Sequence, residues 1–509
     1  MPKKSIIKGT IILSLTGIIA KFLGFFFRIP LIYLIGEEGI GIYQITYPLY
    51  TFLLAISSGV PIALSKMISE RLAVNKNKEA NIIFRSALLL MFLIGSLSSF
   101  ILIFFAKDFI RIFNWNNKVY YSILAIALAP LFTTVLSAFR GYYQGIQNMF
   151  PAGLSQIIEQ IVRVLVGVGL AYILLPYGIE FAASGASFGA TMGSFIGLIF
   201  LIIYFNKSKI IYNKNECSKD FFHITAEIIK IGIPISIAQT IGSIMALIDS
   251  ALVVGLLKAS GFDDVTATSL YGQLTGKAFV LINVPLTISV AIAQSTVPAI
   301  SESYAIKSRI KLNHNINMAY KMAMILALPS CAGLYTLARP ILSLIFQGLD
   351  SGWQVLQILS ISAFFIILSQ TSTSILNGLG KTYIPLFVML IGSLLKIIFS
   401  YMLIPTNLNI LGAAYSTLIA YFAISVIDII LVIKYTNVIV NIREVVIYPL
   451  LSTLVMIFAV IFSYLELNKY IGVNLTTVIT IFIGGVIYFL MLHITDTFNF
   501  KDIVKLIKG

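Results

Sequence analysis

Six basic side chains stand inside long apolar segments of this 509-residue sequence. A charged side chain at the centre of a bilayer costs roughly 2.5 to 3.5 kcal/mol on insertion scales, so it faces a polar cavity, pairs with an acid or extends to the headgroups. In a cavity, ammonium and guanidinium groups bind anions such as phosphate, and arginine can donate two parallel hydrogen bonds. The six residues are Lys21, Arg28, Lys66, Arg163, Lys277 and Lys396.

Spacing within the first two apolar segments indicates what three of these cations do. Lys21 and Arg28 are seven residues apart, two helical turns, and so share one helix face that could form a cavity wall. Because Arg28 is close to Pro30 and the segment end, extension to the headgroups is the alternative. Lys66 precedes Glu70 by one turn near the segment end, so a local ion pair or extension to the headgroups is its alternative.

A third polar stretch falls in the segment 152–175. Glu159 and Arg163 are four residues apart with the acid first, the favoured order for a helical ion pair, so an internal salt bridge competes with a role in a cavity. Gln156 and Gln160 beside them make this helix too polar to face lipid. Lys396 occupies the matching region of the second half of the chain.

The acids inside apolar segments are candidates for ion coupling. Glu159, Asp249 and Asp428 could each bind H⁺ or Na⁺. Asp249 is the strongest candidate, because it lies in the middle of its segment with Ser243 and Ser250 near, although a structural hydrogen bond explains it equally well. Asp428 could instead pack against a neighbour or face headgroups. The three histidines lie far apart with no cysteine at metal-binding spacing, so we expect no metal and no other cofactor.

Composition identifies the elements that carry these residues as membrane helices. The chain is 59% hydrophobic and 11% charged with a mean hydropathy of +0.97, whereas soluble chains have about 45–50% and 25%. The first apolar stretch has no cleavage site, so we expect it to be retained as a helix. About fourteen spans of sufficient length are predicted, at 9–35, 42–69, 82–106, 119–139, 152–175, 181–205, 225–257, 269–300, 316–338, 353–376, 383–404, 411–433, 445–465 and 472–494.

Charge distribution predicts the orientation and explains the net charge of +15. With a cytoplasmic N-terminus, most of the basic residues fall in inside connections, which favours both termini in the cytoplasm of a multi-pass cell-membrane protein. The basic loops then face anionic membrane lipids, and no basic stripe with interleaved aromatics indicates nucleic-acid binding. The outside connections carry Lys107, Arg111, Lys118, Lys258, Arg339 and Lys469.

An internal repeat divides the spans into two sets of six. Ser69-Glu70 recurs as Ser301-Glu302, and the 179–183 stretch recurs at 410–414, at offsets near 232 residues. An offset of six helices makes the halves parallel repeats, and transporters built this way bind substrate between the halves and rock them. We predict an N-terminal lobe at 1–215, a C-terminal lobe at 216–440, and two further helices with a cytoplasmic tail at 441–509.

Motifs along almost the whole chain resemble those of the stage V sporulation protein B and polysaccharide-biosynthesis membrane protein family. This family lies within the multidrug/oligosaccharidyl-lipid/polysaccharide exporter superfamily. The motifs are Lys8-Gly9-Thr10, Phe22-Leu23-Gly24-Phe25, Glu37 to Tyr43, Arg140 to Gly145, Gln147-Asn148-Met149, Leu175 to Glu180, Tyr271 to Gly276, and Val297 to Glu302.

The resemblance implies a non-enzymatic flippase for a lipid-linked oligosaccharide, a peptidoglycan precursor, in cell-wall or spore-cortex synthesis. Cations in a central cavity would neutralise the pyrophosphate while the lipid tail stays in the bilayer. The expected substrate-binding residues are Lys21, Arg28, Lys66, Gln144, Gln156, Glu159, Gln160, Arg163, Lys277 and Lys396. Leu274 and Lys277 depart from the Arg and acid that some flippases carry in this helix.

Two other functions stay open. An ion-coupled antiporter for a drug or metabolite belongs to the same superfamily, although such antiporters often carry an Asp in the first helix and this chain has none there. A membrane enzyme such as a sugar-lipid transferase is the other alternative, and the chain has no catalytic constellation that favours it. The sequence leaves open the exact sugar, the coupling ion and whether wall-synthesis enzymes dock.

Overall fold

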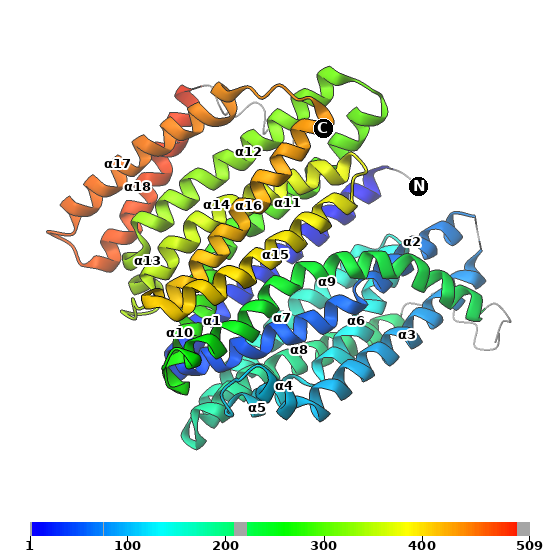
Figure 1. Ribbon diagram of the computed structural model, residues 1–509. Helices are drawn as coiled ribbons and strands as arrows, with labels where there is room; N and C mark the ends of the chain where they lie inside the picture. Colours follow the sequence, from blue (N-terminus) through cyan, green and yellow to red (C-terminus); the bar gives the residue numbers. More distant parts are fainter. Residues whose placement is uncertain (1–2, 75, 208–220, 496–509) are drawn as a thin grey trace. The chain divides into compact units, whose positions relative to one another are not determined.

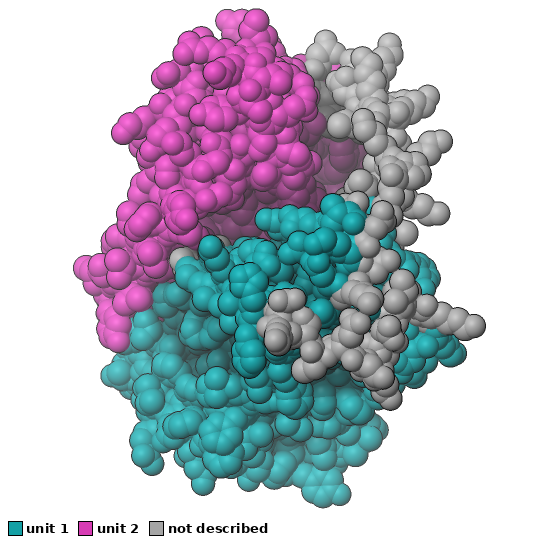
Figure 2. Space-filling view, turned by 90° about the vertical axis from the view of Figure 1, so that its right-hand side faces the viewer, with its two compact units in different colours: residues 1–272 teal, residues 273–509 magenta. Residues whose placement is uncertain are grey.

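The computed structural model describes residues 3–74, 76–207 and 221–495, and these contain helices and no strands. They form two compact units, residues 1–272 and 273–509, coloured separately in Figure 2 and described separately below. The predicted cytoplasmic tail and Cys217 lie outside the described residues.

Unit 1 is an all-helical bundle (Figure 1). Its elements are α1 (Lys3–Ser57), α2 (Gly59–Ala73), α3 (Asn77–Phe104), α4 (Ala106–Ile112), α5 (Val119–Ile126), α6 (Ala129–Gly145), α7 (Met149–Leu174), η1 (Leu175–Tyr177), α8 (Ile179–Lys207), α9 (Phe221–Ala259) and α10 (Asp264–Gly272).

The predicted class, a polytopic all-α membrane protein, is confirmed. In the described part of the chain, twelve helical stretches are long and apolar enough to cross a membrane. The first, Ile19–Leu72, covers two predicted spans, because α1 is interrupted only at Gly36, whose φ of 63° and ψ of −167° break the helix. The seventh predicted span, 225–257, corresponds to α9.

Close contact between α7 and α8 positions the polar stretch of α7. Glycines line the face of α8 that meets α7, and an added Cβ at Gly189 would lie 2.6 Å from the carbonyl oxygen of Arg163. The same atom at Gly193 would lie 2.5 Å from the carbonyl oxygen of Glu159. Small residues allow backbones to approach this closely in membrane proteins. The position of α7 at Glu159 and Arg163 therefore depends on these glycines.

Unit 2 is built around α14, whose buried side chains include many serines and threonines. Such hydroxyls bond to backbone carbonyls of the preceding turn, as Thr371 does to Ile367, and so can be buried at little cost. Its elements are η2 (Gln273–Ala278), α11 (Phe279–Ala305), α12 (Arg309–Thr336), α13 (Ala338–Ile345), α14 (Trp353–Gly378), α15 (Tyr383–Leu403), η3 (Ile404–Leu408), α16 (Ile410–Thr436), η4 (Arg443–Ile447), α17 (Tyr448–Leu467) and α18 (Val473–Ile494).

Two asparagines of α12 hold the segment that leads from α16 to α17. The backbone N–H of Ile439 donates to Asn313 Oδ1 at 2.9 Å, and that of Asn441 donates to Asn317 Oδ1 at 2.8 Å. Asn317 Nδ2 donates in turn to the Ile439 carbonyl at 3.0 Å. Further along, Tyr488 of α18 donates to the Ile325 carbonyl of α12 at 2.9 Å. The last two helices, side by side in Figure 1, are thus attached to α12.

The compact units divide the chain later than the predicted lobes. The boundary falls between residues 272 and 273, not after 215, because α9 packs on α1, α2 and α3 and α10 packs on α1. The carbonyl oxygen of Gly232 on α9 would lie 2.0 Å from a Cβ at Gly59, so no side chain fits between α9 and α2 there. The predicted lobes are based on the repeat in the sequence, and this division into lobes stays a prediction.

Candidate functional site: a cationic cluster on α6 and α7

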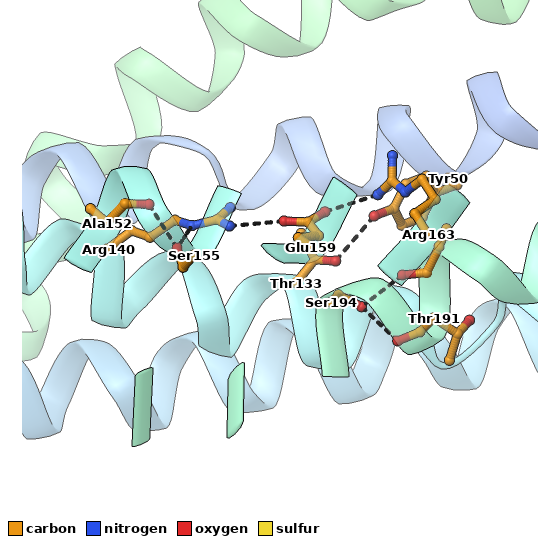
Figure 3. Close-up of polar contacts among 10 residues, drawn as sticks. Tyr50, Thr133, Arg140, Ala152, Ser155, Glu159, Arg163, Thr191 and Ser194 are labelled. Atoms are coloured by element: carbon orange, nitrogen blue, oxygen red, sulfur yellow. Dashed lines mark hydrogen bonds and ion pairs between the residues drawn. The ribbon is translucent and has the colours of Figure 1, made fainter. Parts of the chain in front are cut away.

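One carboxylate on α7 is shared by two guanidinium groups (Figure 3). Glu159 Oε1 accepts a hydrogen bond from Arg163 Nη2 at 2.9 Å, and Glu159 Oε2 accepts one from Arg140 Nη2 at 2.9 Å. The side chains of all three residues are only 12–13% exposed. The salt bridge between Glu159 and Arg163 that the spacing allowed is therefore present, together with a second arginine.

A hydroxyl group holds the Arg140 end of this cluster, and Glu159 holds the Arg163 end. Arg140 Nε donates to Ser155 Oγ at 2.8 Å, and Ser155 Oγ donates to the Ala152 carbonyl at 2.7 Å. Near Arg163, the hydroxyls of Tyr50 and Thr133 are 3.0 Å apart (Figure 3). Arg140 is fixed by Ser155 and Glu159, and Arg163 is fixed by Glu159. Preorganised cations of this kind lower the entropic cost of binding a ligand.

The cluster has an excess of positive charge and a free donor. Arg140 and Arg163 contribute two positive charges against the single negative charge of Glu159. Arg163 Nε is buried and has no acceptor among the described residues. Arg28 of α1 and Arg163 both lie within electrostatic reach of Tyr43 and Tyr47. This arrangement suits a group that carries negative charge and several acceptor oxygens.

The polar side chains predicted on α7 face α1. A Cβ added at Gly17 of α1 would lie 4.0 Å from the side-chain oxygen of Gln156. A Cβ added at Gly24 would lie 3.0 Å from the side-chain nitrogen of Gln160. On α1 itself, Arg28 is half-buried and Lys21 is exposed. The prediction that this stretch of α7 does not face lipid agrees with these contacts.

Two other predicted residues of unit 1 lie apart from the cluster's ion pairs. Lys66 is 3.9 Å from Glu70 on the same helix, and both side chains are about 60% exposed, which is the local pair given as the alternative. Exposed pairs of this kind contribute little to stability. Gln144 is half-buried near the end of α6. Their assignment to substrate binding stays a prediction.

In unit 2, the two predicted cations are fully buried. Lys277 Nζ donates to Ser351 Oγ at 2.8 Å and to the Leu349 carbonyl at 3.0 Å, and it lies 5.8 Å from the centre of the Phe346 ring. Its ammonium group therefore holds the loop before α14 and is satisfied by protein atoms. Lys396 on α15 is 1% exposed. Their roles in binding substrate are not tested by these contacts.

The ion-coupling candidates differ in their surroundings. Asp428 on α16 is fully buried, and its Oδ2 accepts hydrogen bonds from Thr373 Oγ1 at 3.2 Å and Ser369 Oγ at 3.4 Å. Its Oδ1 has no donor among the described residues. Asp249 on α9 is 3% exposed. Glu159 is the acid bound by two arginines. The described residues contain no group of three His, Cys, Asp or Glu side chains that could hold a metal ion.

Arg140 was missed as a site residue because the sequence places it at an inside connection. The structure folds α6 and α7 into a hairpin, which brings Arg140 beside Glu159 although the two are 19 positions apart. The sequence signal that could have found Arg140 is the short turn between Gly145 and Met149. Arg140 precedes this turn and Glu159 follows it, so an antiparallel pair of helices can bring them together.

Comparison with known proteins decides the family. The model of the polysaccharide biosynthesis protein family matches residues 6–304, more than half of the chain. The chain belongs to this family. A second model, MatE, matches residues 234–402. As a family member, the chain is a multi-pass membrane protein related to transporters and flippases.

Two relatives from Bacillus subtilis cover most of the chain. Stage V sporulation protein B is 28% identical over 454 residues, covering 87% of this chain and 86% of that protein. The lipid II flippase MurJ is 27% identical over 448 residues, covering 82% and 80%. These values confirm the resemblance found in the motifs.

Solved structures confirm the fold. The chain resembles the lipid II flippase MurJ in an inward closed conformation with a TM-score of 0.70 at 19% identity, covering 97% of this chain and all of that one. It also resembles an inward-facing multidrug resistance MATE family transporter of the MOP superfamily, with a TM-score of 0.68 at 13% identity over 82% and 94% of the two chains.

Proposed function

We propose that this protein is a flippase for a lipid-linked oligosaccharide, a peptidoglycan precursor, and not an enzyme. The observation that carries the proposal is the cluster of Arg140, Glu159 and Arg163, which has one net positive charge and a buried donor free at Arg163 Nε. The pyrophosphate of a lipid-linked sugar is an anion with several acceptor oxygens, and it cannot cross hydrocarbon without a partner. The names of the relatives MurJ and stage V sporulation protein B support a role in wall or spore-cortex synthesis.

In this proposal the protein works by alternating access of its two lobes. Gln156 and Gln160, which lie against α1, offer amide groups to sugar hydroxyls. Arg28 adds a third cation, which shares its tyrosine neighbours Tyr43 and Tyr47 with Arg163. The lipid tail stays in the membrane, so the lipids are part of the transport path. We place both termini on the cytoplasmic side of the cell membrane, following the distribution of basic residues.

The test is reconstitution of the purified protein in liposomes with a fluorescent lipid-linked disaccharide-peptide, followed by an assay of accessibility in the outer leaflet. We expect the rate of appearance to fall at least tenfold in Arg28→Ala and in Arg163→Gln. Arg339→Gln is the control, because this arginine is exposed and paired with Asp350 in unit 2. A wild-type protein that moves no lipid under any ion gradient, and instead carries a soluble cation, would contradict the proposal.

An ion-coupled antiporter is the second candidate, favoured by the likeness to a multidrug transporter and by the buried Asp428. Exchange of Asp428 for Asn removes a carboxylate that has only hydroxyl donors, so it disturbs few contacts. An antiporter driven by H⁺ or Na⁺ at this residue loses gradient-driven export in Asp428→Asn, whereas a flippase that does not depend on it keeps lipid movement. Asp249→Asn provides the same comparison for α9.

A further inference from the structure

A separate cavity of about 690 Å³ lies at the end of unit 1 where α3, α7 and α9 finish. Its lining comes from α4, from the connection between α4 and α5, from α5, and from the adjoining ends of α8, α9 and α10. The orientation predicted from the basic residues places this end outside the cell. The lining residues are Lys107, Ile110, Arg111, Asn114, Trp115, Asn117, Lys118, Tyr120, Tyr121, Glu180, Lys258 and Asp264.

Two of the four cations in this cavity already have acidic partners. Lys258 Nζ lies 2.7 Å from Asp264 Oδ1 and also donates to the side-chain oxygen of Asn114 at 3.1 Å. Lys118 Nζ lies 2.8 Å from Glu38 Oε1. The remaining acid, Glu180, is in the first turn of α8, where the helix N-terminus favours a negative charge. These contacts account for five charges around the cavity, including Glu38.

The other two cations, Lys107 and Arg111, are exposed and form no ion pair with any described residue. They are four positions apart on α4, so they lie on the same helix face and repel each other. Lys107 Nζ lies 5.6 Å from the centre of the Tyr120 ring, which holds it at the cavity wall. Helical spacing therefore places two like charges beside a polar hollow, where an anion would relieve their repulsion.

The same hollow offers groups that bind uncharged sugar. Tyr121 is 42% exposed, and its ring centre lies 4.7 Å from that of Phe181, which fixes the orientation of the tyrosine. The side chains of Asn114 and Asn117 are exposed at the rim. A sugar has polar hydroxyl groups and an apolar ring face. A binding site with an oriented aromatic side chain and nearby amide groups can contact both.

We propose that this cavity binds a sugar phosphate, with Lys107 and Arg111 on the phosphate and Tyr121, Asn114 and Asn117 on the sugar. The choice of a sugar as the remainder of the ligand rests on the proposed function, whereas the cationic cavity does not. The site would hold the head of a delivered lipid-linked sugar, or a free sugar phosphate, on the side opposite the N-terminus.

Trp115 supplies a direct reporter of binding. It lines the cavity, is 2% exposed, and is fixed by its indole N–H, which donates to the Ser250 carbonyl. The chain has only one other tryptophan, Trp353. A Trp353→Phe protein in phosphatidylcholine nanodiscs is titrated with N-acetylglucosamine-1-phosphate and with inorganic pyrophosphate at constant ionic strength. Trp115 fluorescence and titration calorimetry are recorded together.

We expect saturable binding of both probes, with the sugar phosphate tighter than pyrophosphate, and a loss of affinity of at least tenfold in Lys107→Gln/Arg111→Gln. Tyr121→Ala should weaken the sugar phosphate and leave pyrophosphate unchanged. The control double variant Arg339→Gln/Lys469→Gln removes the same charge from exposed positions in unit 2 and should bind normally. Absence of binding in both measurements, or equal binding by the cavity variant, overturns the proposal.

Two further arms identify the source of the ligand. Phosphatidylglycerol nanodiscs that abolish binding would show that bulk lipid headgroups occupy the cavity, which also overturns the proposal. Nanodiscs containing the lipid-linked disaccharide should compete with the soluble sugar phosphate if the delivered head is the ligand. A protein that flips lipid but binds neither probe contradicts only this inference, and one that binds the probes but flips nothing contradicts only the proposed function.

Discussion

Glu159 is the residue on which the cationic cluster depends, since it is the common partner of Arg140 and Arg163. Removing one partner from a buried ion pair costs much more than the net value of the pair, because the remaining charge is left buried without compensation. Here the loss of one carboxylate leaves two such charges. An amide substitution at Glu159 therefore tests stability as much as transport, and its effect on transport alone does not identify an ion-coupling acid.

We expect Glu159→Gln to lower the free energy of unfolding by about 3 kcal/mol, measured by denaturant titration in detergent. Replacing the arginines as well, in Arg140→Met/Glu159→Gln/Arg163→Met, should recover much of that loss because no buried charge remains. Glu466→Gln is the control, since its pair with Lys469 is exposed and should change stability by less than about 1 kcal/mol. Equal effects of Glu159→Gln and Glu466→Gln would contradict this account of the cluster.

At the scale of elements, the packing of α8 on α7 sets the position of the cluster. Gly189 and Gly193 meet backbone oxygens of the two residues that form the ion pair, so the glycines act on the site without contacting a ligand. Single substitutions of these α8 glycines should thus alter function by moving α7, although the glycines do not belong to the cluster themselves.

Gly189→Ala should push α7 and α8 apart, lower the free energy of unfolding by about 1–3 kcal/mol and reduce lipid movement. The matched control is Gly169→Ala on α7, where an added Cβ meets nothing within 4 Å. This control should be neutral or slightly stabilising, because alanine favours helix more than glycine does. Thermal unfolding of the two variants side by side measures the difference, and equal midpoints would refute the packing argument.

The elements were largely predictable from sequence, because apolar length alone specifies a membrane helix. One exception is α1, where two predicted spans join with a break at a single residue, Gly36. Another is the predicted span 119–139, which is divided between α5 and α6. The site was less predictable. The pair of Glu159 and Arg163 follows from helical spacing, but Arg140 joins it only through the α6–α7 hairpin. Lys277 finds its partner 74 positions away in a loop, which no local pattern indicates.

At the scale of the whole molecule, the distribution of basic residues predicts which ends of the helices face the cytoplasm. In a Cys217→Ser/Cys331→Ser background, we expect a cysteine at Lys469 to react with an impermeant maleimide added to intact cells. A cysteine at Lys381 should react only after the cells are opened. Both positions are exposed and belong to unit 2, so they form a matched pair. The reverse pattern would invert the orientation and place the cavity of unit 1 in the cytoplasm.

The asparagine contacts of α12 have a mechanical consequence. Asn313 and Asn317 bind the backbone of the α16–α17 connection much as a neighbouring strand would, and Tyr488 fastens α18 to the same helix. The hairpin of α17 and α18 should therefore move together with α12 as one rigid body. In the proposed transport cycle it adds membrane area and viscous drag to unit 2 but no independent joint, so truncation before α17 should not create a new movement of the remaining helices.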